Sequence, residues 1–233
     1  MFNRKAKDHR LTARVLAALL GYPGAELRAA LPELAQALDD EAVLPPPRRQ
    51  ELRALMLSLL RGDPYEVEER YVETFDRGRS TSLHLFEHVH GDSRERGPAM
   101  IDLVETYAQA GLQLGDTELP DHLPVVLEFV STQPPTVARE FLGEMAHILN
   151  AVFSALLKRE SPYACVLAAV LELAGERPQA VKVQADEPLD EAWAEPPAFD
   201  GCSTRGQAAP GQPQPIHIVR KTTSHPDSQG ARA

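Results

Sequence analysis

Residues 134–177 have the sequence PPTVAREFLGEMAHILNAVFSALLKRESPYACVLAAVLELAGER. Pro134 and Pro135 are typical of a helix start, because proline fits the first helical turn. Apolar residues then keep one helical face for about four turns, at Phe141, Met145, Ile148, Leu149, Val152 and Leu156. The pattern predicts that the two prolines open the longest helix of the chain.

A second helix in this stretch starts at Ser161 and Pro162. Between Tyr163 and Ala174 its only charged residue is Glu172, so we expect it to be buried on most of its sides. No run of alternating apolar and polar residues competes with these helices. The strand-like fragments, 181–183 and 216–219, are short and isolated.

Apolar stripes that end at Gly or Pro also run through the residues before 134. Asp63 followed by Pro64 predicts an N-terminal cap, and the next helix carries one apolar face at Val67, Tyr71 and Phe75. Asp121 is expected to cap a short apolar helix that follows it. The helix opened by Pro98 is expected to face inward with Met100, Ile101, Val104, Tyr107 and Ala108.

These patterns predict an all-α fold of about eight helices, with a helical domain over residues 1–177. From residue 178 the composition changes, because eight of the 20 prolines fall in 178–233 among Gly, Gln, Ser and Ala. We expect residues 178–233 to be an acidic, Pro/Gly-rich flexible tail without a core of its own. Within it, Leu189 and Trp193 lie four residues apart and would share a face of a short helix.

The composition is that of a globular protein with an acidic surface. The 233 residues carry a net charge of −10, which disfavours nucleic-acid binding and suits a partner that presents a basic segment. No segment approaches the ~20 apolar residues of a membrane helix. The two cysteines, Cys165 and Cys202, form no disulfide framework, so we expect a cytoplasmic protein.

One short motif would bind zinc in another setting. His84, Glu87 and His88 match the H-x-x-E-H pattern of a class of zinc proteases, and on a helix both histidines would share a face. A zinc hydrolase needs a third protein ligand, and the sequence singles out none. No phosphate loop, dinucleotide motif or nucleophile elbow is present either. We therefore expect no enzyme and no metal site, and keep the hydrolase as a remote alternative.

Polar and aromatic residues gather instead in two short segments. Residues 73–96 carry carboxylates, histidines and arginines with Phe75, Leu85 and Phe86 interleaved, and residues 118–122 carry Glu118, Asp121 and His122. One interpretation is a solvated, charge-rich surface. The other is a peptide-binding surface, with apolar residues as its floor and carboxylates that pair with a basic ligand.

These two segments resemble a known family. YVETFD (71–76), STSLHLFEHVHGDSRERGPAM (80–100) and ELPDHL (118–123) are similar to NarJ-type chaperones, within the wider TorD-like group of redox-enzyme maturation chaperones. Residues 123–129, 161–164, 214–217 and the acidic segment around Trp193 extend the similarity. The resemblance covers most of the chain and is strongest from 65 to 175. It implies one TorD-like helical bundle without catalytic activity.

The resemblance also implies a function and a partner. Such chaperones bind the apo catalytic (alpha) subunit of respiratory nitrate reductase in the cytoplasm, including its N-terminal segment. They hold it ready for insertion of the molybdenum bis-guanine-dinucleotide cofactor and delay its docking onto the membrane anchor. The chaperone itself keeps no cofactor, and the implied partners extend to the alpha–beta complex and to molybdenum cofactor biosynthesis proteins. The rival interpretation is a maturation adaptor for another apo-molybdoenzyme.

Under this resemblance nine residues are expected to contact the partner's peptide. They are Tyr71, Glu73, Asp76, His84, Glu87, His88, Glu118, Asp121 and His122. No catalytic, cofactor-binding or metal-binding residue is expected.

Overall fold

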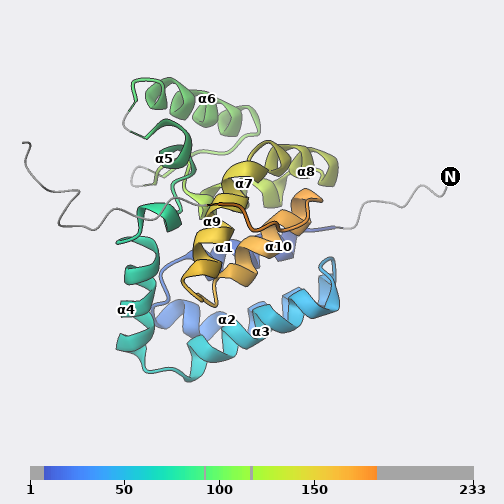
Figure 1. Cartoon of the computed structure of the whole chain (residues 1–233). Coiled ribbons are helices and arrows are strands. Elements are labelled where there is room, and N and C mark those ends of the chain that lie inside the picture. The colour runs from blue at the N-terminus through green and yellow to red at the C-terminus, as the bar shows by residue number, and fades with distance from the viewer. Residues whose placement is uncertain (1–7, 92, 116–117, 183–233) are drawn as a thin grey trace, which may run out of the picture. The chain divides into compact units, whose positions relative to one another are not determined.

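The computed structural model describes residues 8–91, 93–115 and 118–182, and this part of the chain is helical (Figure 1). Its helices are α1 (Arg10–Leu20), α2 (Ala25–Glu41), α3 (Pro46–Arg61), α4 (Pro64–Phe75), the 3-10 helix η1 (Arg79–Thr81), α5 (Leu85–His90), α6 (Arg96–Gln109), α7 (Leu123–Thr132), α8 (Pro135–Glu144), α9 (Ala146–Lys158) and α10 (Ala164–Ala174). The described residues contain no strand longer than an isolated bridge. The all-α prediction is therefore confirmed.

The chain divides into one unit of residues 1–186 and another of 187–233. The second unit lies entirely outside the described residues, and so do the predicted fragment 216–219 and the segment around Trp193. The last helix ends at Ala174, and residues 175–182 follow it without regular secondary structure. A tail that begins at 178 stays a prediction.

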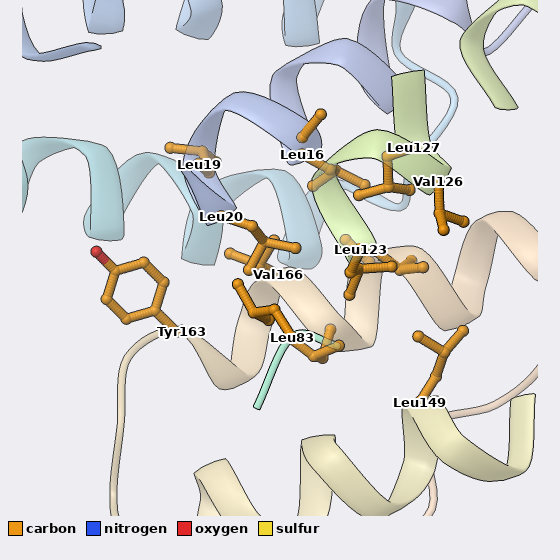
Figure 2. Packing of buried hydrophobic residues seen from close by; sticks show 14 of the residues in the cluster. Leu16, Leu19, Leu20, Leu83, Leu123, Val126, Leu127, Leu149, Tyr163 and Val166 are labelled. Carbon is orange, nitrogen blue, oxygen red and sulfur yellow. The ribbon is translucent and has the colours of Figure 1, made fainter. Parts of the chain in front are cut away.

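Helices α1, α7 and α10 carry the centre of the hydrophobic core. α1 packs against α7, and α10 packs against α1, α3, α8 and α9. Figure 2 shows residues of these surfaces: Leu16 and Leu20 of α1, Leu123 and Leu127 of α7, Val166 of α10 and Leu149 of α9 belong to one hydrophobic cluster. Residues 166–171 of α10 are all buried, so the prediction of a helix enclosed on most sides is confirmed.

The helix expected to be the longest is divided into α8 and α9, which meet at Met145 at an angle of 67°. Gly143, a weak helix former, precedes the break, and the Met145 amide donates to the Leu142 carbonyl in a tight turn. The bend lets both short helices pack against α10, which a straight helix would not allow. Among the described residues the longest helix is α2, with 17 residues. The division at Met145 and the unassigned α5 explain why we expected about eight α-helices and the described residues contain ten.

Helix α6 faces the bundle with only part of the side predicted for it: Tyr107 is buried as expected, and Leu103, which was not expected, is buried too. Its buried residues are Leu103 and Tyr107, whereas Ile101 is 60% exposed and Val104 is 40% exposed. Tyr107 fixes this side, because its hydroxyl donates to the Pro120 carbonyl (2.7 Å) and its ring packs on Phe129. The inward orientation expected for Ile101, Val104 and Ala108 is therefore wrong.

Helix α4 follows the prediction. The Asp63 side chain accepts hydrogen bonds from the amides of Tyr65 and Glu66 and so caps the helix. Val67, Tyr71 and Phe75 are all buried. The Tyr71 hydroxyl donates to the Leu20 carbonyl (2.7 Å), which ties α4 to the end of α1.

Within the described part of the chain, no single helix has both the length and the apolar character of a membrane span. Helices α8 and α9 reach that length and composition only when taken together, across their bend.

Candidate functional site

The two polar segments singled out in the sequence cross each other in the fold. His84 and His122 form an antiparallel bridge, in which the Leu123 amide donates to the Leu83 carbonyl (2.9 Å) and the Leu85 amide donates to the Asp121 carbonyl (3.1 Å). The crossing lies just before α5 and just before α7. It brings side chains almost forty residues apart in the sequence into one group.

Asp121 is at the centre of this group and is fully buried. Its Oδ2 accepts a hydrogen bond from the amide of Phe86 (3.1 Å), in the first turn of α5. Helix α7, by contrast, begins after His122 without a side-chain cap. The prediction that Asp121 caps α7 is therefore wrong, and its side chain instead caps the start of α5. The bridge explains the difference, because it places the start of α5 beside the Asp121 carboxylate.

Four further side chains gather around Asp121. His84 Nδ1 lies 3.5 Å from Asp121 Oδ1, and Arg96 Nη2 lies 3.9 Å from Asp121 Oδ2 and 3.5 Å from Glu87 Oε1. The His122 ring stacks on the His84 ring, with centroids 5.0 Å apart. We call His84, Glu87, Arg96, Asp121 and His122 the His84 cluster.

The His84 cluster holds opposite charges at neutral pH. Burial opposes ionisation of Asp121, but the contact with His84 and the hydrogen bond from the Phe86 amide outweigh it and lower the Asp121 pKa. The same contact with Asp121 raises the pKa of His84 against its burial. Burial, together with the neighbouring His84 charge, lowers the pKa of His122 to about 4. His122 is therefore neutral near pH 7 and stacks on a ring that binds a proton more readily.

The H-x-x-E-H residues do not lie as a zinc motif requires. His84 precedes α5 in an extended conformation. The expectation that His84 and His88 share a helical face is therefore wrong. His88 Nε2 contacts the Ser82 carbonyl (2.9 Å), and Glu87 Oε2 accepts a hydrogen bond from the Ser82 hydroxyl (2.7 Å). Within residues 8–91, 93–115 and 118–182, no three His, Cys, Asp or Glu side chains form a group able to hold a metal ion.

The predicted contacts on α4 lie in different surroundings. Tyr71 belongs to the core. Asp76 is exposed, and its charge acts on His122 by raising that residue's pKa against the effect of burial. Glu73 is exposed too, and its backbone carbonyl accepts a hydrogen bond from Arg159 (3.2 Å). The charge of Asp76 is thus felt at His122, while Glu73 borders another part of the surface.

Glu118 stands at the edge of a groove of about 240 Å³ between α1, α7 and the segment after α6. We call it the Glu118 groove. Its apolar lining consists of Tyr107, Leu112, Leu114, Val125 and Phe129. Its polar lining includes the exposed Glu118, Glu128 and Arg14, together with Gln113, Ser131 and Thr132. Sequence reasoning missed Glu128, Tyr107 and Phe129 as site residues, because their spacing is that of ordinary helix stripes and nothing in it reveals that their edges line a groove.

Comparison with known proteins gives the same family as the sequence motifs. Residues 23–169 match the model of the family described as nitrate reductase delta subunit. The chain is 42% identical to the nitrate reductase molybdenum cofactor assembly chaperone NarJ of Escherichia coli K12 over 183 residues, which cover 78% of this chain and 77% of that relative. It is 34% identical to the probable assembly chaperone NarJ of Bacillus subtilis over 176 residues, 73% of this chain and 93% of the relative.

A further relative, the probable nitrate reductase molybdenum cofactor assembly chaperone NarW of Escherichia coli K12, is 47% identical over 118 residues, 51% of each chain. The family match covers more than half of this chain and contains the whole His84 cluster. The relatives carry the names of assembly chaperones and not of catalysts, in agreement with the expectation that the chain is no enzyme. The chain belongs to the nitrate reductase delta subunit family.

Proposed function

We propose that this chain is a maturation chaperone for respiratory nitrate reductase. It binds the apo catalytic subunit in the cytoplasm, alone or with the beta subunit, and holds it ready to receive the molybdenum bis-guanine-dinucleotide cofactor. The observation that carries the proposal is the 42% identity, over 183 residues, to an assembly chaperone of that enzyme. The cofactor is cargo for the partner, and this chain keeps none of it.

The partner's N-terminal segment is the peptide we expect the chaperone to bind. The Glu118 groove supports this choice, because its floor is apolar and aromatic while Glu118 and Glu128 place two carboxylates at its edge. An amphipathic segment with basic residues would bury its apolar face in the groove and pair its cations with these carboxylates. The net charge of −10 adds a long-range attraction for such a segment.

Occupation of that segment also gives the chaperone its timing role. While the segment lies on the chaperone it is not available to the membrane anchor, so docking waits until the chaperone leaves. Contact with cofactor biosynthesis proteins would then take place on the complex, before release.

Calorimetry with the N-terminal peptide of the catalytic subunit tests the proposal. We expect binding by the full chain that weakens, but persists, when salt rises from 50 to 500 mM, because salt screens the rim carboxylates and leaves the apolar contact. Replacing both rim carboxylates (Glu118→Gln with Glu128→Gln) removes up to two exposed ion pairs of roughly 0.2–1 kcal/mol each. Glu140→Gln, an exposed carboxylate on α8 outside the groove, is the matched control and should change nothing.

A pull-down from nitrate-grown cells identifies the partner. Recovery of the nitrate reductase catalytic subunit supports the proposal, whereas recovery of a different apo-molybdoenzyme in its place would assign the chain to that enzyme. Absence of peptide binding at 50 mM salt by a chain that is folded by circular dichroism would disprove the peptide part of the proposal.

A further inference from the structure

The turn between α9 and α10 forms a second pocket, which the proposed function does not use. This pocket has a volume of about 310 Å³ and lies between α3, α4 and residues 159–163. Its apolar walls are Leu55 and Leu59 of α3, Val67 of α4, and Pro162. We call it the Tyr163 pocket, after the aromatic residue that closes it. It contains the Ser161–Pro162–Tyr163 part of the family motif, which the Glu118 groove and the His84 cluster leave unexplained.

The Tyr163 hydroxyl forms no hydrogen bond with any residue in the part of the chain that the structure describes. The residue is 4% exposed, and its ring packs on Phe75 and Tyr71 at centroid distances of 5.0 and 6.1 Å. Tyr71 uses its own hydroxyl to reach the Leu20 carbonyl, but among the described residues none forms a hydrogen bond with the Tyr163 hydroxyl. In Figure 2 this hydroxyl points away from Val166, and it has almost no exposed surface of its own, so a ligand reaches it only when the neighbouring side chains move apart. A buried hydroxyl without a partner costs free energy, and a ligand's acceptor group would recover it.

Charged groups around the pocket balance one another. Arg70, held by a hydrogen bond from its Nε to the Glu66 carbonyl (3.1 Å), and Arg159 supply two positive charges. Glu73 and Glu160 supply two negative charges. With no net charge at the entrance, the pocket favours a ligand that is itself neutral. Apolar walls and one unused donor then define its chemistry: an apolar group that carries a hydrogen-bond acceptor.

We propose that the Tyr163 pocket binds one apolar side chain of a partner's peptide segment, and that the backbone carbonyl beside this side chain accepts a hydrogen bond from the Tyr163 hydroxyl. The volume suits one large side chain with its adjoining backbone. A neutral peptide carbonyl matches the balanced charges better than a carboxylate or an ammonium group does. The inference rests on the proposed function only for the identity of the partner, the apo catalytic subunit.

Removing the Tyr163 hydroxyl should change ligand binding without lowering the stability of the fold. Tyr163→Phe keeps the ring contacts and removes only the unpartnered hydroxyl, so the melting temperature should stay the same or rise. Binding of N-acetyl-leucine amide, followed by NMR on the full chain, should weaken about 5-fold, as the loss of one neutral hydrogen bond predicts. Tyr65→Phe is the matched control, because Tyr65 lies on α4 and is 81% exposed.

A second variant tests the pocket without touching its base. Ser58 is an exposed residue of the lining, and Ser58→Phe should fill the entrance and abolish binding of the amide. Gln50→Phe puts the same ring at an exposed position of α3 outside the lining and should have no effect. N-acetyl-glutamate amide and N-acetyl-lysine amide should bind more weakly than the leucine compound, because each brings a net charge.

Capture of the apo catalytic subunit by the chaperone decides whether the natural ligand of the Tyr163 pocket is the partner's chain or a free small amide. If Ser58→Phe weakens capture of the subunit while the N-terminal peptide still binds, the pocket is an anchor for the partner's chain. If the amides bind but capture is unchanged, the pocket binds free small amides and the partner-anchor proposal is overturned. Absence of amide binding at 10 mM, or equal binding by Tyr163→Phe, also overturns it and leaves the proposed function standing. Failure of both the N-terminal peptide and the subunit to bind would instead remove the proposed function.

Discussion

Helices α10 and α6 have similar lengths and opposite surroundings. α10 is enclosed by α1, α3, α8 and α9, and its apolar residues are buried on nearly every side. α6 lies at the edge of the bundle (Figure 1). Leu103 and Tyr107 are its buried residues, and Ile101 and Val104 are exposed. The difference shows that a stripe of apolar residues in the sequence does not by itself tell which of those residues are buried within the same chain.

The largest expected effect is in α10. Leu167 has no exposed surface, so Leu167→Ala should leave a cavity in the core and lower the free energy of unfolding by about 2–5 kcal/mol. Urea unfolding followed by circular dichroism measures this change. A loss below 1 kcal/mol would mean that α10 is less tightly enclosed than its contacts indicate.

An intermediate effect is expected at Asp121, beside the bridge between His84 and His122. Asp121→Asn keeps the shape of the side chain but removes the charge that faces His84 and Arg96, and should cost roughly 1–3 kcal/mol at pH 7. Because the Asp121 pKa is lowered in the folded state, its contribution is complete above its ordinary value of 3.8 and is lost as pH falls through the lower folded value. The difference between wild type and Asp121→Asn in urea unfolding should therefore shrink at the acid end.

The control for this variant is Asp102→Asn, an exposed position on α6. It should leave the unfolding free energy unchanged at every pH. If Asp121→Asn behaved like Asp102→Asn, the buried carboxylate would have no role in holding the two segments together.

The smallest effect on stability is expected on the outer face of α6. Ile101→Ser removes an exposed side chain and should change the free energy of unfolding by no more than about 0.5 kcal/mol. The same urea titration as for Leu167→Ala provides the measurement. A loss above 1 kcal/mol would show that this face is covered within the chain, and the contrast between the two helices would disappear.

Much of the fold could be predicted from local sequence. The cap at Asp63, the buried face of α4 and the enclosure of α10 follow from residue spacing alone, and the comparisons confirm the family expected from residues 80–100 and 118–123. The bend at Met145 could not be predicted, because the apolar stripe continues across it and only packing against α10 distinguishes one helix from two.

The candidate site was predictable in composition but not in arrangement. Sequence proximity groups His84 with Glu87 and His88, and Asp121 with the helix after it. In the fold, Asp121 serves the start of α5, because a bridge between distant segments decides its neighbours. The Tyr163 pocket could not be predicted from the sequence beyond the motif at residues 161–163. Whether a hydroxyl lacks a hydrogen-bond partner depends on which residues surround it in the folded structure.

The bridge between His84 and His122 has a consequence for how this family can diversify. Residues 85–121 run from one side of this bridge to the other, and two backbone hydrogen bonds and the buried Asp121 hold their ends together, while Tyr107 adds a second contact with the bundle through Phe129 of α7. The ends of this segment are fixed whatever lies between them, and lengthening a closed loop costs little additional entropy. Insertions, deletions and new surface residues can therefore accumulate in the connection after α6 while α1, α7 and α10 keep their register. A chaperone built in this way can change the partner it recognises without rebuilding its core.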